Sequence, residues 1–161
     1  MTRQVCDTLN YGGEDREINS LPLQPFIDQH SIAETLDRTC SMIWRGYYCH
    51  WKMLDGRLLL SEFHGIMKGF RVAVMSDLFP DAQGAVLASW CSGEIVMPEG
   101  ELISSGMYDT CEYDHVLTIS KGEIVSDVLI ENTPDRMEEK LQRTISTIKT
   151  YIAARQHVTD N

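Results

Sequence analysis

The sequence predicts an α+β domain, in which a curved, mostly antiparallel β-sheet is covered on one face by a C-terminal amphipathic helix. Period-two alternation dominates the middle of the chain, compact turn dipeptides separate the alternating runs, and an apolar stripe with helical spacing closes the sequence. Such hairpin signals do not fit a parallel doubly wound sheet, which needs long crossover connections. We expect the 161 residues to form one domain, with a β-rich body over 1–131 and a helix over 133–155.

The strongest local signal is a hairpin in the first half of the chain. Over residues 45–53 the odd-numbered side chains share one face of a strand and the even-numbered ones share the other. Asp55-Gly56 follows, a pair favoured in type I′ turns, and a second strand returns over 57–63. Neighbours on a strand point to opposite faces, so Cys49 and His50 do not form a nucleophile–base pair with each other.

Turn, cap and alternation signals of the same kind predict the other elements of the body. They are a hairpin with strands over 5–9 and 16–18, an extended connection over 21–26, a short helix over 31–39 with a capping box at Ser31–Glu34, strands over 70–75, 86–91 and 94–97 with turns at 92–93 and 98–100, and a hairpin over 116–119 and 124–130 around Lys121-Gly122.

The C-terminal helix has well-marked boundaries. Thr133 is a suitable N-cap, and Pro134 fits the first helical position, where a missing N–H is tolerated. Asp135 and Glu138 lie in the first turns, where the positive end of the helix dipole favours carboxylates. The apolar residues are spaced by three or four and form one stripe, made of Met137, Leu141, Ile145, Ile148 and Ile152.

Charge is the most informative feature of the composition. The 24 acidic residues outnumber the 14 lysines and arginines, giving a formal net charge of −10. A general nucleic-acid-binding protein needs a positive surface, so that class is not expected. Residues 76–130 carry ten of the acids and the single base Lys121, so the negative charge is concentrated in the second half of the body.

The leading functional hypothesis is therefore a non-enzymatic acidic protein that binds a basic protein partner. The specific form of this hypothesis is an immunity or inhibitor protein. Such a protein would neutralise a cationic, nuclease-like toxin by occluding its active cleft. A solubilising acidic surface explains the same composition. The partner-binding residues expected are Glu94, Glu99, Glu101, Asp109, Glu112 and Asp114.

Two alternatives remain open. One is a small enzyme or ligand-binding protein that uses a pocket between sheet and helix, lined by Arg45, Cys49, His50 or His64. The other is a structural or assembly protein, which an exposed apolar patch would support. The geometry of the pocket distinguishes the enzyme hypothesis from the binding-protein hypothesis, because Arg, His and Cys side chains that converge in one pocket favour an enzyme.

No cofactor or metal is expected from the motifs. Glu62 and His64 share a strand face, for which a surface pair is the simpler interpretation. Cys111, Asp114 and His115 offer metal-binding atoms but lack the four-ligand spacing of structural zinc, and a polar turn before residue 116 is favoured instead. The five cysteines are an odd number without a C-x-x-C pair, which indicates reduced thiols.

Several runs resemble a small, uncharacterised bacterial protein family. They are Trp44-Arg45-Gly46-Tyr47, Trp51 with Asp55-Gly56-Arg57-Leu58, Leu78-Phe79-Pro80, Ala88-Ser89-Trp90-Cys91-Ser92-Gly93 and Pro98-Glu99-Gly100-Glu101. The resemblance covers about residues 40–130 and implies a bacterial or phage protein, but no activity, cofactor or site residue. Because the sequence lacks a secretory apolar run and a membrane-length apolar segment, a cytoplasmic location is expected.

Overall fold

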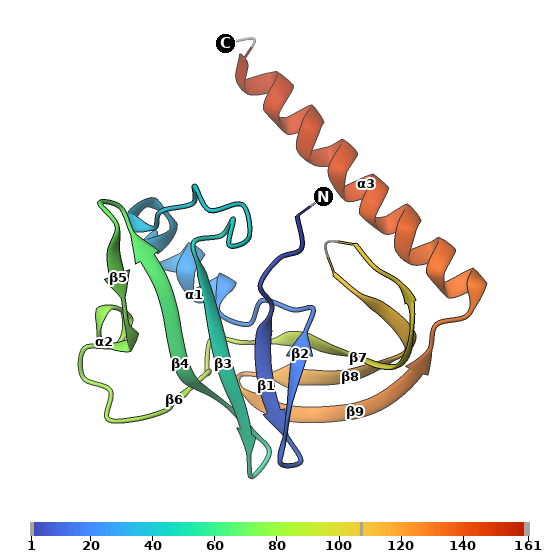
Figure 1. Cartoon of the computed structure of the whole chain (residues 1–161), viewed down its shortest axis with the longest axis horizontal. Coiled ribbons are helices and arrows are strands. Elements are labelled where there is room, and N and C mark those ends of the chain that lie inside the picture. Colours follow the sequence, from blue (N-terminus) through green and yellow to red (C-terminus); the bar gives the residue numbers. More distant parts are fainter. Residues whose placement is uncertain (1, 107, 160–161) are drawn as a thin grey trace. The chain divides into compact units, whose positions relative to one another are not determined.

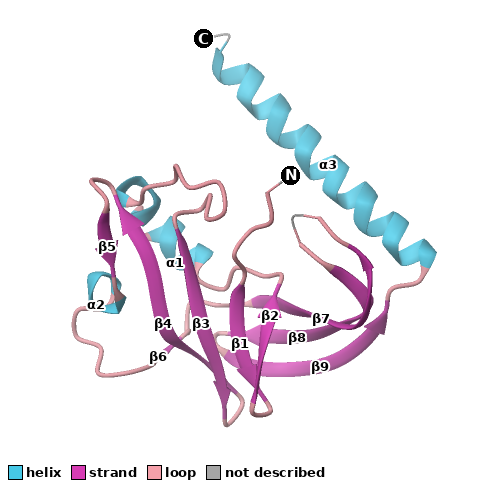
Figure 2. Ribbon diagram, in the orientation of Figure 1, coloured by secondary structure: helices cyan, strands magenta, loops and turns pink. Residues whose placement is uncertain are grey.

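The computed structural model describes residues 2–106 and 108–159, although the side chains of 155 and 157–159 are left out. The chain divides into two compact units, Met1–Ile130 and Glu131–Asn161, which we describe separately. Within the described residues, the first unit is built on a nine-stranded, curved and mostly antiparallel sheet, and the second is a helix (Figures 1 and 2). The α+β class is therefore confirmed, whereas the placement of the helix over the sheet stays a prediction.

The elements follow one another in an order that places most strands beside a sequence neighbour. The sheet order is β2-β1-β3-β4-β9-β8-β7, with β5 and β6 pairing with β4, and β1 runs parallel to β3 (Figure 2). The elements are β1 (Asp7–Tyr11), β2 (Glu14–Ile18), α1 (Gln24–Gln29), the 3₁₀ helix η1 (Ile32–Thr35), β3 (Tyr47–Leu54), β4 (Arg57–Met67), β5 (Arg71–Ala73), α2 (Met75–Leu78), β6 (Val86–Leu87), β7 (Gly93–Ser104), β8 (Thr110–Ser120), β9 (Glu123–Glu131) and α3 (Pro134–Thr159).

The curvature of the sheet brings the two strands at the ends of the sheet order, β2 and β7, close together. Just after β2, the N–H of Asn19 donates to the carbonyl of Val96 on β7 at 2.9 Å, and the N–H of Val96 donates to Ser20 Oγ at 2.9 Å. The sheet thereby wraps around one apolar core, because inward-facing side chains from most strands meet there. The largest of them are Trp51, Tyr47, Leu9, Leu60, Met97 and Leu117.

The two hairpins expected around dipeptide turns are confirmed. Asp55 and Gly56 have φ values of 51° and 74°, and Lys121 and Gly122 have φ values of 49° and 84°. Type I′ turns require positive φ at both central positions, and Gly at the second position meets that need without a side-chain clash. The sequence signal succeeds here because the turn chemistry is local.

Two expectations in the segment before β3 are wrong. Residues 21–26 do not form one extended connection, because α1 begins at Gln24 and accommodates Pro25 in its first turn, where no N–H is needed. The helix expected over 31–39 is only the single 3₁₀ turn η1. Ser31 adopts a left-handed φ of 53° and its side chain makes no cap hydrogen bond, so the capping box does not form.

The strands after β4 also differ from the expectation. Within 70–75 only β5 is a strand, and Phe70 and Val72 are exposed while Ala73 is buried. Within 86–91 only β6 is a strand. Pro98 and Gly100 do not form a turn but lie inside β7, which occupies the end of the sheet order. An edge strand tolerates a proline, and the pairing of β7 with β8 is irregular after Glu99.

The second unit contains α3, and the start predicted for this helix, with Pro134 as its first residue, is confirmed. The N–H of Arg136 donates to Thr133 Oγ1 at 3.3 Å, which is the expected N-cap contact, and Pro134 is the first helical residue. The helix extends to Thr159, four residues beyond the expected end. Among the described residues no helix has the length and apolar character needed to cross a membrane.

Candidate functional site

Strands β3 and β4 place two polar cross-strand pairs on the face of the sheet that points away from the core. Opposite residues of an antiparallel pair project to the same side. Cys49 and Phe63 are one such pair and point into the core. The next pairs on either side, His50 with Glu62 and Tyr48 with His64, therefore project outward.

A β-bulge in β4 creates this arrangement. Trp51 pairs with Leu60 but His50 pairs with Glu62, so Ser61 has no cross-strand partner. Strict alternation from Leu60 would turn Glu62 toward the core. With the extra residue, both Ser61 and Glu62 lie on the outer side and β4 returns to the core at the next position.

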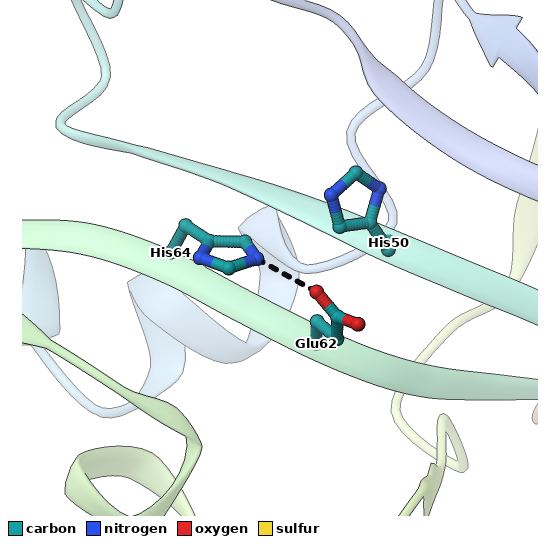
Figure 3. A group of neighbouring side chains, drawn as sticks. All are labelled: His50, Glu62 and His64. Carbon is teal, nitrogen blue, oxygen red and sulfur yellow. Dashed lines mark hydrogen bonds and ion pairs between the residues drawn. The ribbon is translucent and has the colours of Figure 1, made fainter.

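The bulge brings three metal-ligating side chains together. One ligand atom each from His50, Glu62 and His64 lies within 4.8 Å of the other two. His64 Nε2 and Glu62 Oε2 are 2.9 Å apart, and His50 reaches the group from the neighbouring strand (Figure 3). The side chains of His64 and Glu62 are 42% and 60% exposed, so an ion from solvent has access to the cluster.

Neighbouring side chains hold both imidazoles. Thr8 Oγ1 of β1 lies 2.5 Å from His50 Nδ1, which leaves Nε2 as the ring nitrogen available to a metal. The Tyr48 ring stacks on His64 with centroids 4.9 Å apart and an interplanar angle of 20°. Contacts of this kind limit ring rotation and lower the entropy cost of binding an ion.

A cavity of about 460 Å³ adjoins the cluster on the same face. His50 and Glu62 form part of its wall, so two of the three ligand residues are accessible from it. Its other polar lining residues come from strands β1 to β4 and are Thr8, Asn10, Asp15, Lys52 and Ser61.

The chemistry of the cluster matches that of known metal centres. Two imidazoles and one carboxylate form the ligand set of several catalytic zinc sites, where a fourth position stays open for water or substrate. Zinc binds such nitrogen and oxygen atoms at roughly 2.0–2.2 Å, so a shared ion requires its ligands to lie within about 4 Å of one another. The 2.9 Å between His64 Nε2 and Glu62 Oε2 already lies in that range, and a ligand atom of His50 lies within 4.8 Å of both groups.

The acidic residues expected to bind a partner are in part neutralised within the chain. Glu99 lies 3.0 Å from Arg16 and 3.3 Å from His115, and Asp109 lies 3.1 Å from Arg3. Pairing of this kind lowers the field that the two carboxylates project into solvent.

The other four members of that set are distributed over both long strands. Asp114 on β8 is buried, with only 3% of its surface exposed. Glu112 accepts a hydrogen bond from the N–H of Glu101 at 3.2 Å, which brings these two acids together. Glu94 and Glu101 on β7 are exposed. The binding of a basic partner by this surface stays a prediction.

Arg45, Cys49, His50 and His64 do not line one pocket. Arg45 and Cys49 are buried in the core, whereas the two histidines project from the opposite face of the sheet. Burial raises the pKa of the Cys49 thiol well above its ordinary value, so this group is a poor nucleophile. The guanidinium carbon of Arg45 lies 5.1 Å from the centroid of the Tyr47 ring, which is a cation–aromatic contact inside the core.

Two further expectations concern β8. Cys111, Asp114 and His115 belong to this strand, so the polar turn expected before residue 116 is wrong. Asp114 and His115 are strand neighbours and point to opposite faces, so the three residues do not converge on one metal. His115 instead pairs with Asp127 of β9 and with Glu99.

Sequence reasoning missed the part that His50 plays in the cluster. The i, i+2 spacing of Glu62 and His64 was visible, but the cross-strand position of His50 depends on the bulge at Ser61. It also missed Asp7, the buried partner of Arg45. The only available signal for Asp7 was an acidic residue at an inward position of a predicted strand.

Comparisons with protein-family models, curated proteins and solved structures found no match to this chain.

Proposed function

We propose that the protein binds a divalent transition-metal ion, of the class that zinc represents, through His50, Glu62 and His64. The observation that supports this proposal is the convergence of three ligand atoms within 4.8 Å on two neighbouring strands. Imidazole and carboxylate together suit zinc better than calcium or magnesium, which prefer oxygen ligands alone.

The surroundings of the three residues favour an accessible site over a purely structural one. Structural zinc is closed by four protein ligands, whereas this cluster supplies three and borders a cavity. A three-ligand ion keeps a position for water or for another ligand. Thr8 and Tyr48 act as positioning residues, because they hold the two imidazoles without supplying a ligand atom of their own to the cluster.

Zinc binding to the untagged full chain, measured by isothermal titration calorimetry, tests the proposal. We expect about one equivalent of zinc per chain for the three-ligand site. His50→Ala and His64→Ala each remove a ligand and are expected to weaken binding by at least about 100-fold. His30→Ala is the matched control, since His30 is an exposed histidine at the C-terminal end of α1, outside the cluster, and its ring contacts the carbonyl of Phe26.

Two outcomes would overturn metal binding at this cluster. One is the absence of zinc uptake by the wild-type chain. The other is an equal loss of affinity in His30→Ala and His64→Ala, which would indicate nonspecific binding to surface histidines. Circular dichroism of each variant establishes that the loss of a ligand, and not unfolding, explains a change in affinity.

A further inference from the structure

The cavity beside the three ligand residues has a charge that a bound metal would invert. Asp15 and Glu62 contribute two carboxylates to its wall and Lys52 contributes one ammonium group, so the formal charge of the lining is negative. A divalent ion held by His50, Glu62 and His64 makes the sum positive. An anionic ligand is therefore disfavoured before the metal binds and favoured afterwards.

Lys52 is the cation best placed to meet such a ligand. It follows His50 by two residues on β3, so both side chains leave the same face of the strand about 6.6 Å apart. Within the described part of the chain, the ammonium group of Lys52 forms no ion pair or hydrogen bond, and the residue is exposed. Its charge is consequently available to a ligand that enters the cavity.

The remaining polar groups of the cavity differ in their availability. Thr8 is engaged with His50, and the side-chain amide of Asn10 donates to Asp15 at 2.9 Å. Ser61, the extra residue of the bulge, has no partner for its hydroxyl among the described residues. The available donors are thus one ammonium group and one hydroxyl, a set that suits an oxygen-rich anion.

We propose that the metal-loaded site binds a small oxyanion, a carboxylate or phosphate group, whose oxygen fills the open metal position while Lys52 pairs with its charge. This inference rests on the proposed metal binding. The volume of about 460 Å³ exceeds that of either group alone, so the cavity also has room for a carboxylate or phosphate carried on a larger organic molecule.

Cobalt substitution gives an optical readout of both steps. Co²⁺ in a site with two imidazoles and one carboxylate has visible absorption bands that change when an anion replaces bound water. The full chain is loaded with Co²⁺ and titrated separately with acetate and with methyl phosphate, which distinguishes the carboxylate and phosphate sources. Lys52→Gln is compared with Lys121→Gln, which removes a lysine from the β8–β9 turn outside the cavity.

We expect saturable spectral changes in the wild type and in Lys121→Gln for at least one of the two anions. Lys52→Gln is expected to bind Co²⁺ normally but to bind the anion roughly tenfold more weakly, the effect of losing one charge-assisted contact. The metal-free chain should bind neither probe.

The possible failures are distinguishable from one another. Normal Co²⁺ binding with a spectrum that neither anion changes overturns the oxyanion site and leaves the proposed metal binding intact. Equal anion affinity in the Lys52 and Lys121 variants overturns the part assigned to Lys52. A chain that takes up no Co²⁺ overturns the metal site and, with it, the oxyanion inference.

Discussion

The guanidinium of Arg45 lies 2.6 Å from the carboxylate of Asp7 in the interior of the first unit, where the two residues are 6% and 0% exposed. Asp7 also accepts hydrogen bonds from Trp51 Nε1 at 2.9 Å and from the N–H of Cys49 at 3.0 Å. One carboxylate thereby joins β1, the segment before β3 and β3 itself. Burial raises the pKa of Asp7, while Arg45 and the two N–H donors act in the opposite direction.

Removing one member of this pair should be strongly destabilising. Asp7→Ala leaves the Arg45 charge buried without its partner, which is expected to cost about 3–5 kcal/mol of unfolding free energy. Urea denaturation measures the change. Arg3→Ala is the control and should cost less than about 1 kcal/mol, because it breaks ion pairs with Glu17 and Asp109 in which the Arg3 side chain itself is 53% exposed. Similar losses in the two variants would contradict the importance of the buried pair.

The cysteines should differ sharply in their reactivity. Cys49 is fully buried, and burial raises the pKa of its thiol, whereas Cys40 is exposed. Iodoacetamide should therefore modify Cys40 in the native protein and leave Cys49 intact until the chain is unfolded. Peptide mass spectrometry of the labelled protein gives the comparison. Labelling of Cys49 at the rate of Cys40 would show that the core around β3 opens readily.

Asp127 should contribute stability that depends on pH. Hydrogen bonds from Tyr11 and His115 lower the pKa of Asp127 below its ordinary value. A carboxyl whose pKa is lower in the folded chain stabilises the fold above its unfolded pKa of about 3.9, and this contribution disappears as the pH falls through the folded pKa. Asp127→Asn should therefore be less stable than the wild type at pH 6, with a difference that shrinks in acid.

Denaturant unfolding at a series of pH values checks this prediction for Asp127. Asp81→Asn is the control, because Asp81 is an exposed aspartate in the loop between α2 and β6. A stability difference between wild type and Asp127→Asn that stays constant from pH 6 to pH 2 would contradict it.

Thr8 should influence metal affinity without being a ligand. Its hydroxyl lies 2.5 Å from His50 Nδ1, so Thr8→Val frees the ring to rotate and removes the contact that selects Nε2 for the metal. We expect zinc affinity to fall about tenfold, as measured by competition with a chromophoric chelator. Thr118→Val, on β8, is the matched control and should bind zinc like the wild type. An unchanged affinity in Thr8→Val would remove its positioning role.

Much of the fold was predictable because turn residues act locally. The remaining elements were not predictable, because they depend on pairing between residues that are far apart in the sequence. Asp55-Gly56 and Lys121-Gly122 fix their turns within two residues, so both hairpins were correctly expected. Pro98 and Gly100 carry a turn signature of similar strength, but Pro98 pairs with Asp114 of β8, and Gly100 lies inside β7 where that pairing is irregular. Tertiary contacts decide such cases, and a single sequence does not specify them.

The candidate site shows the same limit at the level of one residue. The turn at Asp55-Gly56 sets a register in which regular pairing would place His50 opposite Ser61 and Cys49 opposite Glu62. That register would bury a charged Glu62, at a cost that the fold avoids by shifting one residue. The bulge exposes Glu62 and buries Phe63 instead, a side chain worth about 1.5–3 kcal/mol when removed from water.

The most direct test of the central claim is the anomalous scattering of zinc in crystals of the zinc-loaded, untagged chain, recorded on both sides of the zinc absorption edge. Metal binding at the cluster predicts one strong anomalous peak per chain, within bonding distance of His50, Glu62 and His64. A peak only at other histidines, or none at this cluster under saturating zinc, would contradict it.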